Sequence, residues 1–168
     1  MLGTLRQVDD RWQLRFTRTL PHPPAKVWRA ITEPEHLRAW FPAEIHGERV
    51  AGAALRFVFP GGEGPPHDGR MLAFDPPSLL EFLWGEETLR FELAPDGDGT
   101  RLTLVNTFDE QGKAARDAAG WHSCLDLLER RLAGEQPPWD PRERWEQVHP
   151  AYVERFGPAA ATIGPPQG

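Results

Sequence analysis

Cysteine is nearly absent from this sequence, which has only Cys124 among its 168 residues. A lone cysteine excludes an internal disulfide framework. No segment approaches the roughly 20 apolar residues of a membrane-spanning helix. Met1–Arg18 also lacks an apolar run of signal-peptide length. Together these absences predict a cytoplasmic protein that does not enter a membrane.

Runs of basic residues are absent as well. The chain has 19 Lys and Arg against 25 Asp and Glu, a formal net charge of −6. Because nucleic-acid binding depends on a concentrated positive surface, nucleic acid is not an expected partner. The length suits one domain with or without an appendage.

Aromatic residues are abundant, with 7 Trp and 9 Phe. Large rings of low polarity favour either a bulky core or an aromatic pocket, and composition leaves both open. Alternation of polar and apolar residues predicts a strand over Trp12–Leu20. Two short helices follow before Phe41, and from Ala43 to Phe108 the pattern is that of successive antiparallel strands.

The longest helical pattern runs over Gln111–Ala133, with Trp121, Leu125 and Leu128 on one apolar stripe. Since this stripe needs a partner, the helix should cross the concave face of the sheet. The sequence therefore predicts an α+β fold: a curved antiparallel sheet of about six to seven strands wrapped on a long C-terminal helix, with two short helices after the first strand.

The chain divides into a domain over residues 1–134 and a C-terminal extension over residues 135–168. Asp140 and Glu143 form a capping-box pattern at the start of a short amphipathic helix that ends near Phe156. Trp145 and Tyr152 share its apolar face, while Pro150 should kink or divide it. We expect this helix to dock on its own domain or on a partner, giving a homodimer or a protein complex, and the end after Ala159 to fray.

Three segments resemble a known family. They are PPAKVWRAITEPEHLRAWF (Pro23–Phe41), GRMLAFDPPSLLEFLW (Gly69–Trp84) and GWHSCLDLLERRL (Gly120–Leu132). Their spacing is similar to the heat-shock protein 90 ATPase-activator-like domains of the START-like, polyketide-cyclase-like (SRPBCC) superfamily. The resemblance implies a helix-grip fold with a cavity between helix and sheet. That superfamily has no universal catalytic set, so the resemblance assigns no catalytic residue here.

Reactive and metal-binding chemistry finds little support in the sequence. Glu44, His46 and Glu48 alternate, which fits either a metal site or a solvated edge, but no second histidine falls at ligand spacing. Cys124 lies beside the apolar stripe and Ser123 lacks a nucleophile-elbow motif. We expect no metal, no cofactor and no catalytic nucleophile.

Two further patterns leave alternatives open. His122 and Asp126 are spaced for a contact on the helix surface, or for a catalytic dyad if a cleft opens beside them. The loop Gly61–Gly64 lacks the lysine of a phosphate loop, and is either a flexible rim of the cavity or an ordinary hairpin loop.

A ligand site is predicted between the long helix and the sheet. Arg18 and Asn106 fall on inward faces, where an unpaired polar group is costly, so either side chain should meet the polar end of a ligand or bond a neighbouring residue. The apolar members of the predicted site come from the inward aromatic set and its neighbours: Trp40, Phe57, Phe59, Met71, Phe82, Trp84, Phe91, Trp121 and Leu125. A filled core accounts for these rings equally well.

Three functions follow from this pattern. The first is binding of a small, mostly apolar or aromatic ligand, as a carrier or sensor. The second is a co-chaperone-like or regulatory protein-interaction module, and the third a cyclase or hydrolase using the same cavity. A cavity of several hundred Å³ would favour the first and third. A filled core with a large exposed apolar patch would favour the second.

Overall fold

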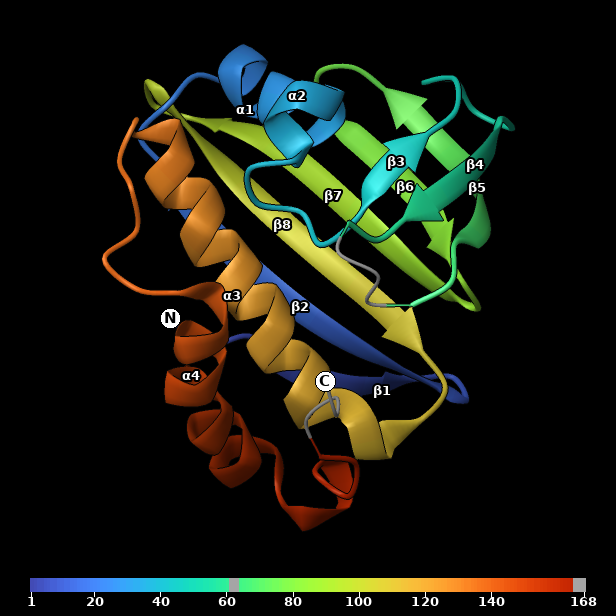
Figure 1. Ribbon diagram of the computed structural model, residues 1–168, viewed down its shortest axis with the longest axis vertical. Helices are drawn as coiled ribbons and strands as arrows, with labels where there is room; N and C mark the ends of the chain where they lie inside the picture. Colours follow the sequence, from blue (N-terminus) through green and yellow to red (C-terminus); the bar gives the residue numbers. More distant parts are fainter. Residues whose placement is uncertain (61–63, 165–168) are drawn as a thin grey trace.

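The computed structural model describes residues 1–60 and 64–164. Eight strands form one antiparallel sheet in the order β1-β2-β8-β7-β6-β5-β4-β3 (Figure 1). The strands are β1 (Thr4–Val8), β2 (Arg11–Leu20), β3 (Glu44–His46), β4 (Ala54–Val58), β5 (His67–Asp75), β6 (Leu79–Trp84), β7 (Glu87–Asp96) and β8 (Gly99–Phe108). The helices are α1 (Pro24–Thr32), α2 (Pro34–Leu37), α3 (Ala114–Leu132) and α4 (Pro141–Phe156). The predicted α+β class is confirmed.

The strand count exceeds the predicted six to seven because of β1. This strand lies at the edge of the sheet and pairs with β2 from Thr4 opposite Arg15 to Val8 opposite Arg11. Its apolar residues Leu5 and Val8 do not alternate, and both are only half-buried. The strand is therefore defined by its backbone pairing with β2 and not by a buried face. Its sequence has no alternation of polar and apolar residues from which a strand could be predicted.

The interior strands follow the predicted alternation closely. In β7, Leu89, Phe91 and Leu93 are buried while the residues between them are half-buried. Leu102 and Leu104 of β8 are also buried and lie opposite Leu93 and Phe91 respectively, although Thr103 between them is buried as well. Cross-strand pairing thus assembles one continuous apolar layer on the concave face of the sheet.

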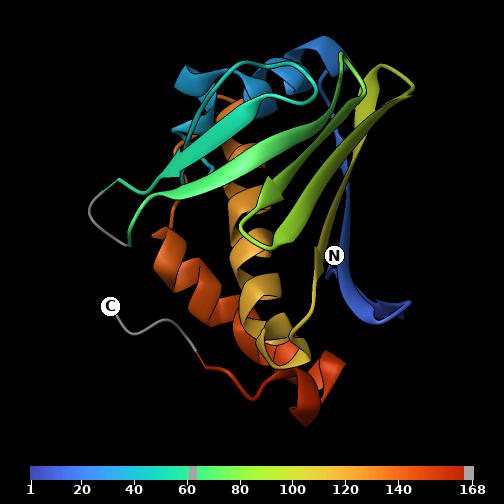
Figure 2. The ribbon, with the colours of Figure 1, turned by 90° about the vertical axis from the view of Figure 1, so that its right-hand side faces the viewer.

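Helix α3 covers this layer, as predicted, and the short 3-10 turn Gln111–Lys113 leads into it. Figure 2 shows the sheet curving around α3. Trp121, Leu125 and Leu128 are at most 8% exposed. Alanines at the start of α3 are fully buried, and because their side chains are small they let helix and sheet approach closely. No helix in the described residues is long and apolar enough to cross a membrane.

Helix α4 lies beside α3 in both ribbon views (Figures 1 and 2). Asp140 and Glu143 form the predicted capping box at its start. The helix docks through Tyr152, which is 0% exposed, and through Trp145, whose Nε1 donates to the Arg116 carbonyl at 3.0 Å. A kink or a division at Pro150 was predicted; the helix is not divided there and runs from Pro141 to Phe156 as one element.

Part of the end predicted to fray packs against the protein. Ala160 is fully buried, and the Ile163 N–H donates to the Gly112 carbonyl at 3.1 Å. These contacts join the segment after α4 to the start of α3. Residues 165–168 of the predicted frayed end lie outside the described residues.

Candidate functional site

The space between α3 and the middle of the sheet is filled with aromatic rings. Ring centroids lie 6.1 Å apart for Trp40 and Phe91, and 5.8 Å apart for Phe41 and Trp121. Phe82 stacks on Phe91 at 6.4 Å. All five rings are less than 10% exposed. At this depth the inward residues form a packed core of the kind that interdigitated side chains give.

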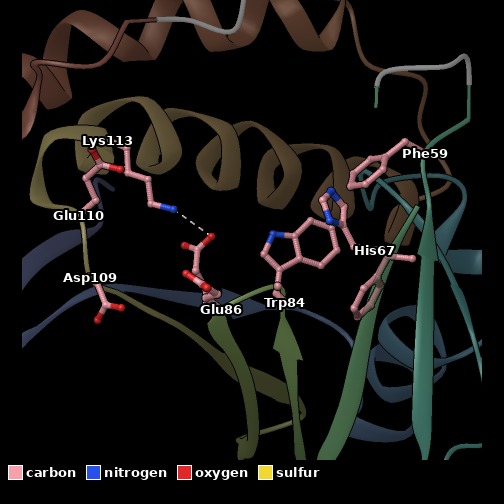
Figure 3. A pocket seen from close by; sticks show the side chains of 10 residues that line it. Phe59, His67, Trp84, Glu86, Asp109, Glu110 and Lys113 are labelled. Atoms are coloured by element: carbon pink, nitrogen blue, oxygen red, sulfur yellow. Dashed lines mark ion pairs between the residues drawn. The ribbon is translucent and has the colours of Figure 1, made fainter. Parts of the chain in front are cut away.

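An open cleft of about 520 Å³ lies at one end of the interface between α3 and the sheet. It is bounded by the segment 109–113 that leads into α3, by the turn between β6 and β7, and by the facing ends of β4 and β5 (Figure 3). We call it the rim cleft. Its lining residues are Phe57, Phe59, His67, Trp84, Gly85, Glu86, Glu87, Asp109, Glu110 and Lys113.

One wall of the rim cleft is aromatic. The Trp84 ring lies 4.8 Å from Phe57 and 5.8 Å from Phe59, and Phe59 in turn lies 5.5 Å from His67, all in edge-to-face arrangements. Phe57 is fully buried, whereas Phe59 and Trp84 are half-buried and His67 is exposed. The wall is therefore anchored in the core and still presents ring surface to the cleft.

The opposite wall is charged. Lys113 lies 3.0 Å from the Glu87 carboxylate, an ion pair drawn as a dashed line in Figure 3, and 3.7 Å from Asp117. Behind Glu87, the Asn106 Nδ2 donates to Glu87 Oε1 at 3.3 Å and to the Thr88 carbonyl at 3.3 Å. Burial raises the pKa of the Glu87 carboxyl, and Lys113 opposes that rise.

The structure brings three of the predicted ligand-binding residues, Phe57, Phe59 and Trp84, into the rim cleft. Asn106 stands behind Glu87. The remaining apolar members, Trp40, Met71, Phe82, Phe91, Trp121 and Leu125, lie in the packed core.

Arg18, the other polar member, is held by protein side chains. It points to α3 and pairs with Asp126 at 2.6 Å, and Arg144 of α4 pairs with the same carboxylate at 2.7 Å. The inward position of Arg18 is thus explained by an ion pair. Arg18 does not line the rim cleft, and its Nε and Nη2 have no hydrogen-bond partner in the described residues.

The predicted surface contact between His122 and Asp126 is buried instead. The two side chains are 3.4 Å apart and only 6% and 13% exposed. Helix α4 covers them, and the hydroxyl of Tyr152 lies 2.7 Å from His122 Nδ1. The predicted contact between the two side chains exists, but the helix that buries the pair lies 15 residues or more further along the chain, and local spacing does not place it.

Seven lining residues were not predicted as site residues: His67, Gly85, Glu86, Glu87, Asp109, Glu110 and Lys113. They lie at strand ends and in turns, where alternation of polar and apolar residues ends. Glu86 belongs to the Gly85-Glu86 turn, which the sequence does mark. The cleft exists because three separate chain reversals meet at the same end of α3.

The metal and nucleophile candidates occupy ordinary positions. Glu44 and His46 lie 3.1 Å apart on short strand β3, both partly exposed, and Glu48 is exposed beyond its end. A second group of potential ligands, Glu33, Glu35 and His36, surrounds the four-residue helix α2 at the surface.

Cys124 should react slowly, because burial raises the pKa of its thiol to about 12. The Cys124 thiolate is the nucleophile that attacks a small disulfide reagent and releases its thiol, so at about pH 8 the folded protein should react at least about a hundredfold more slowly than free cysteine. Absorbance of the released thiol measures the rate. Denatured protein, as the control, should react at the free rate. Fast reaction of the folded protein would contradict the prediction.

A curved antiparallel sheet gripping a long helix, with a cleft where the grip opens, defines a helix-grip protein. The model of the family described as Activator of Hsp90 ATPase homolog 1-like protein matches residues 21–133, and the chain belongs to this family. The match ends before α4 begins. No curated protein matches the chain.

Several solved structures share the fold. A conserved protein of unknown function from Enterococcus faecalis, EF2215, is 23% identical with a TM-score of 0.75, over 92% of this chain and 90% of that one. CalU16 from Micromonospora echinospora is 20% identical with a TM-score of 0.70, over 92% and 95%. DynU16, from the dynemicin biosynthetic locus, is 26% identical with a TM-score of 0.65, over 76% of this chain and 49% of that one.

Proposed function

We propose that the protein binds a small, mostly aromatic molecule in the rim cleft, as a cytoplasmic carrier or sensor. The observation that carries the proposal is the half-open aromatic wall of Trp84 and Phe59 in a cleft of about 520 Å³. Ligand sites in proteins are clefts of this size with apolar walls and a few placed polar groups. The proposal moves the expected ligand from the packed interior to the open end of the grip.

An interaction module is less well supported by the surface. In the described residues, the exposed large apolar side chains are Met1, Val50 and Leu72, which come from separate elements. Partner-binding surfaces usually gather such side chains into one patch.

DynU16, a relative in fold, comes from a biosynthetic locus, and this supports an association with small-molecule metabolism.

The test is a tryptophan-fluorescence titration with 1-naphthalenemethanol, a neutral aromatic probe, using Phe59→Ala as the site variant. Phe59 and Trp84 form one wall, so its loss should weaken binding about tenfold, the equivalent of one aromatic contact. Phe74→Ala is the matched control, since Phe74 is also half-buried but packs on Trp28, outside the cleft. It should bind as the wild type does.

Two results would count against the proposal. One is an absence of saturable quenching in the wild type across naphthalene and flavonoid-like probes. The other is equal binding by the Phe59→Ala and Phe74→Ala proteins, which would place the probe elsewhere. Circular dichroism of each variant checks that the fold is retained.

A second candidate, an enzyme of cyclase or hydrolase type, is favoured by the Glu87–Lys113 pair that faces the cleft. Burial raises the pKa of the Glu87 carboxyl, which makes it a better proton donor and acceptor than an ordinary surface carboxylate. Mass spectrometry of a compound recovered from the protein separates the two functions. A carrier returns the compound unchanged, whereas an enzyme returns a product whose formation Glu87→Gln abolishes.

A further inference from the structure

We infer that the ligand of the rim cleft is a cation: a planar aromatic molecule that carries a protonated amine. This inference rests on the proposed function and adds the chemical class of the ligand. It depends on the balance of hydrogen-bond donors and acceptors around the cleft and on the position of the aromatic wall.

The charged side of the cleft has more acceptors than donors. Its lining contains four carboxylates, from Glu86, Glu87, Asp109 and Glu110, against one lysine. Lys113 is already committed to Glu87 and Asp117. Asp109 is paired with Arg11 at 2.7 Å.

Glu86 and Glu110 take part in no ion pair within residues 1–60 and 64–164. Both side chains are exposed, and Figure 3 places them on either side of the Lys113 chain. They leave an uncompensated negative charge at the cleft. A cation entering there would be attracted, and an anion repelled.

A buried amide behind Glu87 holds one of the carboxylates of the cleft in place. Asn106 is 1% exposed and directs its amide nitrogen at Glu87, a lining residue. Because that nitrogen also faces the Thr88 carbonyl, both of its neighbours are acceptors and the orientation of the amide is fixed. Asn106 Oδ1 then has no hydrogen-bond partner among the described residues. Asn106 does not line the cleft, so it contributes by holding the Glu87 carboxylate, an acceptor that does line it, in place.

The aromatic wall suits a cation equally well. Trp84 and Phe59 present ring surface across the cleft from the carboxylates. The face of an aromatic ring attracts a cation, and Trp is the strongest of the natural rings in this respect. A planar aromatic amine therefore stacks on one wall while its ammonium meets the acceptors of the other.

The experiment compares three probes that share one naphthalene ring and differ in charge: 1-naphthylmethylamine, 1-naphthalenemethanol and 1-naphthoate. Titrations at pH 7 and low salt, read by tryptophan fluorescence, should give tightest binding for the amine and at least tenfold weaker binding for the carboxylate. Since exposed charges are screened within about 8 Å at physiological ionic strength, added salt should narrow this difference.

Two site variants and one control locate the effect. Glu86→Gln and Glu110→Gln should each weaken amine binding about threefold and leave the neutral probe unchanged. Asp98→Asn removes one charge in the turn at the far end of β7, and should leave amine binding unaltered.

The outcomes separate the two proposals. Binding of the neutral probe with equal or tighter binding of the carboxylate overturns the cation inference and leaves the proposed function standing. Tighter amine binding that Glu86→Gln and Glu110→Gln do not change overturns it too, because the charge preference then arises elsewhere. Binding of none of the three probes overturns both.

Discussion

Replacing Asp126 by Asn is expected to lower the free energy of unfolding by about 3–5 kcal/mol, the usual cost of breaking a buried ion pair. Asp126 accepts hydrogen bonds from Arg18 of β2 at 2.6 Å and from Arg144 of α4 at 2.7 Å. The Arg18 side chain is 8% exposed, and its Nε and Nη2 already lack partners in the described residues. Removal of the carboxylate would leave that guanidinium charged and buried. Urea denaturation at pH 7 measures the difference.

Asp109→Asn is the matched control. Asp109 also pairs with an arginine, Arg11, at 2.7 Å, but its side chain is 68% exposed. An exposed pair contributes about 1 kcal/mol or less, so this variant should unfold close to the wild type. Equal effects of the two substitutions would show that the Asp126 cluster is no more than a surface ion pair.

The contribution of the Asp126 carboxylate to the free energy of unfolding should also depend on pH, in a defined direction. Burial alone would raise the pKa of its carboxyl, but hydrogen bonds from His122, Arg18 and Arg144 lower it well below the usual range. A carboxyl with a lowered pKa in the folded state contributes its full stability above the unfolded value, about 3.9, and loses it as the pH falls further. The stability difference between the wild type and Asp126→Asn should therefore be constant from pH 7 to about pH 5 and shrink below about pH 4.

Much of the fold was predictable because its information is local. Inward residues of β6, β7 and β8 alternate, and the stripe of α3 recurs at helical spacing, so each segment by itself reveals which face is buried. Edge strand β1 was missed because half-buried residues such as Leu5 leave no such pattern.

The rim cleft was only partly predictable because no local pattern describes it. Phe57 and Trp84 were expected at a ligand site from their inward faces, whereas Glu86 and Lys113 come from chain reversals that meet only in three dimensions. Arg18 illustrates the same limit. Its unusual polarity was visible in the sequence, but its partner Asp126 lies 108 positions away. Spacing detects that a polar group needs a partner, and tertiary structure decides which one.

The C-terminal extension is expected to be part of the stable fold, so that truncation after Gly134 should be the most damaging change. Truncation removes the fully buried Tyr152, and loss of a large buried aromatic side chain alone costs about 3–5 kcal/mol. It also removes Arg144 from Asp126 and uncovers His122. Against a total stability of about 5–15 kcal/mol, the truncated chain should be largely unfolded or melt far below the full chain. Circular dichroism melting measures this.

Point variants of Tyr152 separate packing from hydrogen bonding. The Tyr152 hydroxyl accepts from the Gly3 N–H at 2.8 Å and lies 2.7 Å from His122, thereby tying the N-terminus and α3 to α4. Tyr152→Phe keeps the ring and should cost about 1–3 kcal/mol, the penalty for leaving buried polar groups unpaired. Tyr152→Ala should approach the truncation in severity.

Sedimentation of the full and truncated chains tests the alternative, in which α4 contacts a second copy of the protein. If the truncated chain melts as the full chain does but sediments as a smaller assembly, α4 joins copies of the protein instead of completing one fold.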